Sequence, residues 1–383
     1  MGEDQRLEAV QRFERGESAT DICRALQRPR SWLYKWLKRK GELTGEPKPV
    51  RAHNRTTVAA EQAVIAIRQA LAVHPYAQMG VNAIKQELHR QKLPCVSPAT
   101  IDRIIKRAGL VRKPKSQPYA AKGKAYPKMP ALGVNSIHQA DLVGPRYIKG
   151  DGRFYSLNAM DIFTHRVCVH PCRRKRDEQV TQGLIRTWQE LGIPDFLQVD
   201  NELCFRGSNR YPRSLGLVLR LCLSLEIQPV FIPPREPWRN GEIENFQKTF
   251  DAAFYRSQFY PSFKELCGKA REFEHYHNEH YIYQCLQHQT PLQVFHRDPG
   301  PIAYLPASFQ LPDGPLPIEN GYIHFMRFIR SDQRLVIFGE SFHVSKDLIY
   351  EYIKATICTE THTLQVRLDD QLVHSFEYRL PHE

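Results

Sequence analysis

The sequence of 383 residues has no long apolar run and no closely spaced cysteine pair. No stretch approaches the roughly 18 consecutive apolar residues that cross a bilayer. The first residues, Met1 to Arg6, do not form the apolar core of a signal peptide. The nine cysteines are odd in number and scattered, without a C-x-x-C pair. We therefore expect no membrane span, disulfide framework or zinc module, but a cytoplasmic protein with reduced, mostly buried thiols.

Acidic residues are few relative to basic ones. The chain has 54 Lys and Arg against 41 Asp and Glu, which gives a formal net charge of +13. Two segments, 31–40 and 111–128, contain no acidic residue at all. A positive excess of this kind favours attraction to a polyanion, although charge by itself indicates neither fold nor reaction. We expect nucleic acid as the partner.

Residues 1–45 contain three short helical patterns, separated by Gly16 and by a turn around Pro29. Apolar side chains recur every three or four residues, so each helix is expected to bury one face. Those faces carry Leu7, Val10 and Phe13, then Ile22 and Leu26, and finally Leu33, Trp36 and Leu37. The third helix, expected from Ser31 to Lys40, suits a helix-turn-helix whose last helix enters the major groove of DNA. The alternative is a plain three-helix bundle with a solvated basic face.

The DNA contacts expected from this unit come from basic and aromatic side chains near the third helix, namely Arg30, Tyr34, Lys35, Lys38 and Arg39.

A second helical block covers residues 57–110. Its last helix begins with a Ser97 cap and Pro98 at the first position. We interpret the block as a second helix-turn-helix with outward Thr100, Arg103, Lys106 and Arg107. A basic, proline-containing linker follows at 111–133, and its Arg112, Lys113 and Lys115 are expected to follow DNA phosphates. An ordinary solubilising tether is the alternative.

The block 134–297 alternates strand and helix patterns in an informative order. Strand patterns at 136–143, 153–160 and 166–169 are followed by a helix at 177–191, a strand at 196–199, a helix at about 213–224, a strand at 229–232 and helices at 242–257 and 261–278. This is the order of the RNase H-like fold, whose central sheet carries acidic residues at strand ends. Strands in 315–383 alternate apolar and polar residues, which predicts a small β-barrel. The chain is thus predicted to be a multidomain α+β protein with N-terminal helix-turn-helix units, an RNase H-like α/β core and a C-terminal small β-barrel.

Carboxylates occupy three distinctive places in the predicted core. Asp141 and Asp200 each end an apolar strand pattern, and glutamates open the helix after Asn240-Gly241. A single acidic residue is ordinarily a solvated surface charge. Two strand-end aspartates with a helix-borne glutamate are instead what two-metal phosphoryl transfer requires, because Mg²⁺ prefers hard oxygen ligands.

The stretches around these carboxylates resemble the retroviral-integrase-like transposases of bacterial insertion sequences. They are Ile137-His138-Gln139-Ala140-Asp141-Leu142, Leu197-Gln198-Val199-Asp200-Asn201 and Pro237-Trp238-Arg239-Asn240-Gly241-Glu242-Ile243-Glu244-Asn245-Phe246. The resemblance implies that Asp141, Asp200 and Glu244 are catalytic and hold two Mg²⁺ or Mn²⁺ ions. It also implies binding of double-stranded DNA, both element ends and target, and assembly as a homo-oligomer on DNA. A bacterial, nucleoid-associated location is expected.

Three glutamates compete for the third position. Glu236 has the spacing from Asp200 that is common in retroviral integrases, but it precedes Pro237, and a residue before proline avoids helical backbone. Glu244 fits the family's Asn-Gly-x-x-Glu pattern. Glu242 lies two positions earlier, about 200° around the helix, so both cannot face the metals. We favour Glu244.

Other polar residues of the core are interpreted more conservatively. Glu202 stands where the family usually has glycine, and we expect it to point to solvent, with an extra ligand as the alternative. His138, His165 and His277 are expected to be structural or DNA-contacting. Asp161 is expected to be a structural or turn carboxylate, with an auxiliary catalytic role as the alternative.

The expected activity is cleavage at the 3′ ends of a mobile element and strand transfer into target DNA. One rival is a DNA-binding regulator, or a domesticated transposase, in which the catalytic fold only scaffolds assembly. Another is an RNase H-type nuclease that cuts RNA–DNA hybrids, although two helix-turn-helix units suit duplex DNA better.

Overall fold

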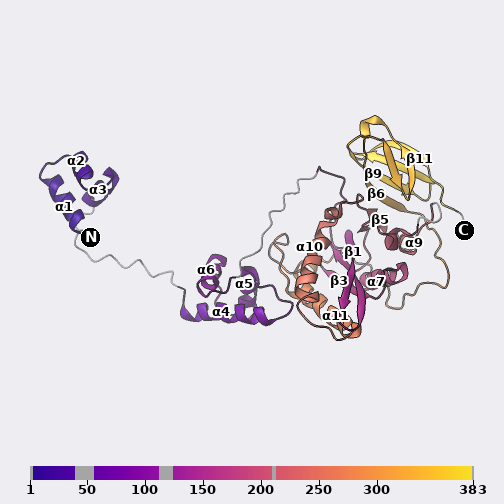
Figure 1. Cartoon of the computed structure of the whole chain (residues 1–383), viewed down its shortest axis with the longest axis horizontal. Coiled ribbons are helices and arrows are strands. Elements are labelled where there is room, and N and C mark those ends of the chain that lie inside the picture. Colours follow the sequence, from indigo (N-terminus) through magenta and orange to yellow (C-terminus); the bar gives the residue numbers. More distant parts are fainter. Residues whose placement is uncertain (1–2, 39–55, 112–123, 209–212, 382–383) are drawn as a thin grey trace. The chain divides into compact units, whose positions relative to one another are not determined.

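The computed structural model describes residues 3–38, 56–111, 124–208 and 213–381. The chain divides into two compact units, Met1–Val58 and Ala59–Glu383. Each unit is described on its own below, with elements labelled as in Figure 1.

The N-terminal unit contains the three helices expected from the sequence: α1 (Glu3–Glu14), α2 (Ala19–Ala25) and α3 (Arg30–Leu37). The Ser18 hydroxyl accepts a hydrogen bond from the Asp21 backbone N–H and caps α2. Ala9, Ile22 and Leu33 are fully buried at the centre.

Two details of this unit differ from the apolar pattern. Leu7 is 38% exposed, because the side chains that α1 turns inward are Ala9, Val10 and Phe13. Trp36 is only half-buried, and the Arg6 guanidinium covers its ring at 4.3 Å. Helix α3 ends at Leu37, with Lys38 as its C-cap, and Arg39 and Lys40 lie outside the described residues.

The second unit begins with α4 (Val58–Val73), α5 (Val81–Arg90) and α6 (Pro98–Arg107). As expected, Ser97 caps α6 by accepting from the Thr100 N–H. The three helices bury one shared apolar cluster, which consists of Val64, Ile67, Ile84, Leu88, Ile101, Ile104 and Ile105. The helices are therefore present as predicted, while their use as a second helix-turn-helix stays a prediction.

The core is a mixed sheet whose strand order identifies the fold. Strands β1 (Ile137–Ile148), β2 (Gly152–Asp161) and β3 (Val167–Cys172) form an antiparallel meander. Strands β4 (Phe196–Val199) and β5 (Gln228–Phe231) then add parallel to β1, which gives the order β5-β4-β1-β2-β3. This is the RNase H-like arrangement predicted from the sequence.

Helices cover both faces of this sheet (Figure 1). On one face, α7 (Asp177–Glu190) and α9 (Leu217–Ser224) pack through Leu184, Trp188 and Leu221. On the other face, α10 (Gly241–Thr249) and α11 (Phe263–His280) pack through Ile243, Phe246 and Phe273. Two short helices, α8 (Leu203–Arg206) and α12 (Pro291–Arg297), complete the core. Because side chains alternate along a strand, β1 presents Ala140 and Leu142 to the first face and turns Gln139 and Asp141 to the second.

Two helices of the core differ in extent from the prediction. The helix expected from Arg213 begins only at Leu217, after the N-cap Gly216. The helix expected from Glu242 to Ser257 divides into α10 and a π-helical turn η4 (Phe250–Tyr255).

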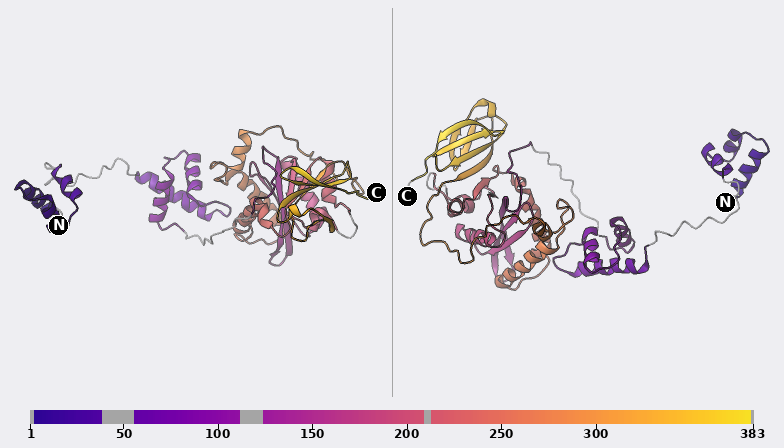
Figure 2. Two further views of the ribbon diagram at one scale, coloured as in Figure 1. Left: turned by 90° about the horizontal axis from the view of Figure 1, so that it is seen from above. Right: turned by 180° about the vertical axis from the view of Figure 1, so that it is seen from behind.

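The C-terminal strands are joined to the core sheet. Strand β6 (Tyr322–Phe328) pairs in parallel with β5, and β9 (Tyr352–Cys358), β10 (Thr363–Leu368) and β11 (Gln371–Glu377) continue the same nine-stranded sheet. The remaining strands, β7 (Arg334–Ile337) and β8 (Glu340–His343), form a separate hairpin. Figure 2 shows these strands, in orange to yellow, from above and from behind.

The predicted C-terminal strands are thus present, and their arrangement adds three findings. Strand β11 has no counterpart in the prediction. The hairpin buries Leu335 and Ile337 in the apolar cluster that also contains Phe325 and Leu364. Among the described strands, the hairpin does not pair with the nine-stranded sheet, so the C-terminal strands enclose their core by side-chain packing and not by a closed ring of paired strands. The β5–β6 pairing makes the strands continuous with the core sheet, and the Phe231 and Phe325 rings stack across it at 5.0 Å.

Substitution of Phe325 tests this continuity. Phe325→Ala removes a fully buried ring, which costs about 3–5 kcal/mol in a typical core. We expect faster hydrogen exchange in β4 and β5 as well as in β6, because the strands share one sheet and one apolar cluster. Leu372→Ala in β11, where the side chain is 52% exposed, is the control and leaves β4 unchanged. An increase confined to β6–β11 would contradict a continuous unit.

Candidate active site at the edge of the sheet

Asp141 lies in the middle of the long strand β1 and is partly buried. Its carboxylate accepts hydrogen bonds from the Leu142 backbone N–H, at 2.8 Å, and from the Gln247 side-chain amide of α10. The second bond ties strand β1 to α10, one helical turn beyond Glu244. The side chain therefore faces α10.

Asp200 follows directly after β4 and lies level with Asp141. In the parallel β1–β4 pair, His138 is opposite Leu197 and Gln139 is opposite Gln198. Continued by two residues, this register brings Asp141 opposite Asp200 on strands about 4.8 Å apart. The turn after Asp200 is fixed by the Glu202 N–H, which donates to the Asp200 carboxylate at 3.0 Å.

Helix α10 begins at the same edge because Asn240 fastens it there. Asn240 is buried, donates to the Ala140 carbonyl of β1 at 3.3 Å and accepts from the Gln198 amide of β4 at 3.1 Å. The Gln139 side chain accepts from the Ile243 N–H in the first turn of α10. Three polar side chains thus hold the start of the helix over the β1–β4 edge, and Glu244 lies in its first turn.

The electrostatics of the three carboxylates also indicate proximity. Burial raises the pKa of Asp200 to about 7, and the negative charges of Glu202 and Asp141 add to that rise. Burial raises the pKa of Glu244, and the charge of Asp141 raises it further. Burial likewise raises the pKa of Asp141, against the hydrogen bond from Gln247. The charge of Asp141 therefore acts on both of the other predicted site residues.

The two competing glutamates are directed elsewhere. Glu236 accepts from the Tyr352 hydroxyl at 2.8 Å and from Arg239 at 2.9 Å, in the loop before α10. Glu242 is exposed, and its charge opposes the fall in the pKa of His165 that burial causes. Glu244, by contrast, is coupled electrostatically to Asp141.

Glu202 differs from the expectation that it points to solvent. Its carboxylate pairs with Lys175, in the loop before α7, and its charge adds to the burial-driven rise in the pKa of Asp141 and Asp200. Lys175 and Gln247 have no place among the predicted site residues. Gln247 follows Glu244 by three residues, so helical spacing alone places both on one face. For Lys175 the sequence carries no signal, because a loop position does not reveal its spatial neighbours.

The histidines and Asp161 have structural surroundings. Burial lowers the pKa of His138 and of His277 to about 3 and also lowers that of His165, so all three favour the neutral form. Asp161 accepts from the Asn135 and Thr164 backbone N–H groups and from the Thr164 hydroxyl, which fixes the turn between β2 and β3.

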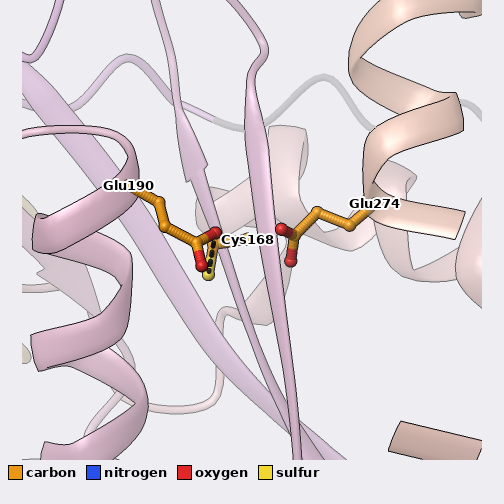
Figure 3. Close-up of side chains that lie close together, drawn as sticks. All are labelled: Cys168, Glu190 and Glu274. Carbon is orange, nitrogen blue, oxygen red and sulfur yellow. Dashed lines mark hydrogen bonds between the residues drawn. The ribbon is translucent and has the colours of Figure 1, made fainter. Parts of the chain in front are cut away.

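A second acidic cluster is shown in Figure 3. Among the described residues, only Cys168, Glu190 and Glu274 bring three possible metal-ligand atoms within 4.8 Å of one another. The carboxylates at the β1–β4 edge are thus spaced more widely. In the Cys168 cluster, Arg186 already donates to Glu274 at 2.8 Å and to Glu190 at 2.9 Å. Because a guanidinium neutralises both carboxylates, this cluster is a buried ion-pair network rather than a fitting site for a divalent cation.

The residues predicted to contact DNA are mostly at the surface. Arg30, Tyr34, Lys35 and Lys38 are exposed in the N-terminal unit. On α6, Arg103 is exposed and Thr100 is half-buried, whereas Lys106 pairs with Asp102 at 2.6 Å and Arg107 with Glu61 at 3.2 Å. The other predicted contacts lie outside the described residues: Arg39, Arg112, Lys113 and Lys115.

Comparison with known families identifies the first unit. Residues 1–46 match the family model of the homeodomain-like domain. The chain begins with a homeodomain-like helix-turn-helix unit. This agrees with the helix-turn-helix predicted for the N-terminal residues, while the predicted domain boundaries stay a prediction.

Solved structures similar to this chain include retroviral integrases. The HTLV-2 integrase catalytic core domain in complex with magnesium is 16% identical, with 44% of this chain and 100% of that chain covered and a TM-score of 0.34. A simian T-cell lymphotropic virus intasome in complex with PP2A regulatory subunit B56 gamma is 14% identical, with 77% and 93% covered and a TM-score of 0.38. The BIV integrase core is 16% identical, with 43% and 95% covered and a TM-score of 0.32. These TM-scores are too low to support a fold assignment. The RNase H-like assignment is therefore based on the strand order.

Among the described helices, none is both long and apolar enough to cross a membrane.

The raised pKa of Asp200 predicts a pH effect on stability. Its pKa rises from 3.8 to about 7 on folding, so the folded chain holds this proton more tightly than the unfolded chain. The free energy of unfolding without divalent ions should therefore fall as the pH rises between these values. We expect Asp200→Asn, which cannot ionise, to unfold at a higher temperature than the wild type at pH 8, with a smaller difference at pH 5. Asp195→Asn, at an exposed position, is the control, and a pH-independent difference for Asp200→Asn would contradict the assignment.

Proposed function

We propose that the chain is a DNA transposase or integrase that cleaves and joins DNA by phosphoryl transfer. The observation that supports this most directly is the placement of three carboxylates. Asp141 lies in β1, Asp200 directly follows the adjacent parallel strand β4, and Glu244 lies in the first turn of a helix fastened to the same edge. The charge of Asp141 acts on both other carboxylates.

The donor set fits divalent cations of the Mg²⁺ type. All three groups are carboxylates, which are the hard oxygen ligands that Mg²⁺ and Mn²⁺ prefer. Burial raises their pKa values, which means that the surrounding protein does not supply enough positive charge or hydrogen bonds to stabilise the ionised carboxylates. In the proposed site Asp141, Asp200 and Glu244 would together hold the ions. Two such ions supply charge neutralisation at a scissile phosphate and lower the pKa of an attacking hydroxyl.

The residues of the chain contribute position and surroundings. Gln247 orients the Asp141 carboxylate, and the Glu202 N–H orients that of Asp200. Burial lowers the pKa of His138 and of His277 to about 3, so both imidazoles are weak bases and neither is assigned the role of general base. In the first step the oxygen of water bonds to phosphorus and the bond to the leaving oxygen breaks, which frees a 3′-OH. In the second step that 3′-OH attacks a phosphodiester of target DNA, and no covalent bond to protein forms.

Recognition of duplex DNA is assigned to the helical units. The exposed basic side chains of α3 suit contacts with the backbone and bases of the major groove. Assembly of at least two copies is proposed because two ends of an element must be joined in one event. A DNA-binding regulator that uses the core only as a scaffold is the rival, and it requires no reaction at the three carboxylates. A nuclease for RNA–DNA hybrids is the other rival.

Substitution of Glu244 separates catalysis from binding. Glu244→Gln keeps the size and hydrogen-bonding capacity of the side chain but removes the charge proposed to hold a metal ion. We expect at least a roughly 100-fold loss of strand transfer with Mg²⁺ or Mn²⁺, as a loss of several kcal/mol in transition-state stabilisation implies, and unchanged affinity for cognate duplex DNA. Glu242→Gln, in the same turn but exposed, is the matched control and retains activity. Full activity of Glu244→Gln would exclude the assignment.

The proposed DNA contacts of α3 have a measurable salt signature. Lys35→Ala should weaken binding to cognate and non-cognate duplexes alike if Lys35 contacts a phosphate. The slope of log K against log salt should fall in magnitude by about 0.9, as expected for one contact with B-DNA. Arg24→Ala, on α2 and also exposed, serves as the control. Equal slopes for Lys35→Ala and the wild type would remove Lys35 from the interface.

A further inference from the structure

Arg327 of β6 is a buried cation with unusual partners. It is 8% exposed, and each hydrogen-bond acceptor that the structure gives its guanidinium among the described residues is a neutral oxygen. These acceptors are the Asn201 side chain at 2.8 Å and the carbonyls of Ile232, Met326 and Val336. Burial and the nearby Arg206 lower the pKa of Arg327 to about 9. A buried charge without an opposite charge is costly, so its retention calls for a specific purpose.

The Asn201 contact shows what Arg327 holds. Asn201 directly follows Asp200, and its own amide donates to the Ile232 carbonyl at 2.7 Å. The same Ile232 carbonyl accepts from Arg327 at 3.2 Å. Arg327 thus ties the turn that carries Asp200 to the end of β5, where the loop toward α10 begins. Its fork of N–H groups is the feature that lets one side chain bond both segments.

Tyr352 of β9 holds the other segment. Its hydroxyl donates to both carboxylate oxygens of Glu236, at 2.8 and 2.9 Å, and Glu236 is paired with Arg239. The Arg239 guanidinium lies over the Tyr352 ring at 4.9 Å and over the Tyr126 ring at 4.2 Å. Arg239 immediately precedes Asn240, which fastens the start of α10. Tyr352 therefore fixes the loop that leads to Glu244.

We propose that the C-terminal strands are part of the active site, with Arg327 and Tyr352 as positioning residues for Asp200 and Glu244. The inference rests on the proposed function, because it concerns the placement of the carboxylates assigned there. In this proposal the C-terminal strands stabilise the active site of their own subunit. This role is separate from any contact with DNA or with other subunits. Arg327 acts through Asn201 and Tyr352 acts through Glu236, so both are positioning residues and not catalytic residues.

One substitution of each residue tests the proposal in the full chain. Arg327→Met keeps an unbranched apolar side chain but removes the guanidinium with its hydrogen bonds, and Tyr352→Phe keeps the ring and removes only the hydroxyl. A displacement of about 1 Å at reacting groups can cost about 100-fold in rate. We expect kcat for strand transfer to fall about 10-fold to 100-fold in each variant, with KM for DNA within about two-fold of the wild type.

The decisive measurement is the requirement for divalent cation. Calorimetric titration with Mn²⁺, without DNA, should show that the dissociation constant for Mn²⁺ rises about 10-fold in both variants. Substitutions of residues that orient metal ligands by hydrogen bonds typically have effects of this size. Excess Mn²⁺ should then restore part of the lost kcat. Arg334→Met on β7 and Tyr322→Phe on β6, both exposed, are the matched controls and should leave both quantities unchanged. A general loss of packing would lower the unfolding temperature without this rescue by excess cation.

The outcomes distinguish this inference from the proposed function. If the wild type neither transfers strands nor binds Mn²⁺ in a manner abolished by Asp200→Asn, the proposed function fails, and the positioning role with it. If the wild type does both, and Tyr352→Phe and Arg327→Met have wild-type Mn²⁺ affinity and kcat, only the positioning role is overturned. Should Arg327→Met not fold, Tyr352→Phe decides the matter alone, because the removal of one hydroxyl leaves the ring packing in place.

Discussion

The parallel pairing of β1 with β4 is the constraint from which the rest of the site follows. Its register pairs Gln139 with Gln198, and the same register continued by two residues leads to Asp141 within β1 and to Asp200 directly after β4. Asn240 then hydrogen-bonds both strands, so the same pairing that aligns the aspartates also fixes where α10 starts. Glu244 reaches the edge of the sheet because its helix is fastened there.

Carboxylates held close together repel one another. The two acidic clusters of the core, at Cys168 and at Asp141, differ in how basic side chains offset this repulsion. Around Cys168, Arg186 forms salt bridges with Glu190 and Glu274, so both carboxylates already have a positive partner and are poor ligands for a divalent cation. Around Asp141, Lys175 pairs with Glu202 instead, and the carboxylates keep raised pKa values. A site that is to accept divalent cations needs this second condition, since its ligands must be held together without a permanent counter-ion. Burial raises the pKa of Glu274 in the Cys168 cluster to about 7 as well, so the two clusters differ in their salt bridges and not in the direction of the pKa shift. The proposal of a cation site at Asp141 therefore depends on the carboxylates that have no salt bridge to Arg186.

The sequence allowed much of the core to be predicted, for physical reasons that also explain what it did not reveal. Short apolar runs such as Phe196–Val199 match β4 residue for residue, because burial on both faces leaves a plain pattern. The rule for residues before proline correctly placed Glu236 on a loop, with φ −120° and ψ 60°. The β5–β6 pairing, Lys175 beside Glu202 and Arg327 beside Asn201 were not predictable, because each depends on contacts between segments distant in sequence. The catalytic roles of Asp141, Asp200 and Glu244 stay predictions, now with a geometry that supports them.

The most direct test of the account is anomalous X-ray scattering at the manganese edge from crystals of the chain grown with Mn²⁺. The account predicts an anomalous peak in contact with the carboxylates of Asp141 and Asp200, and its loss in crystals of Asp200→Asn. A peak at Cys168, Glu190 and Glu274 instead, or Mn²⁺ bound identically in the wild type and Asp200→Asn, would contradict it.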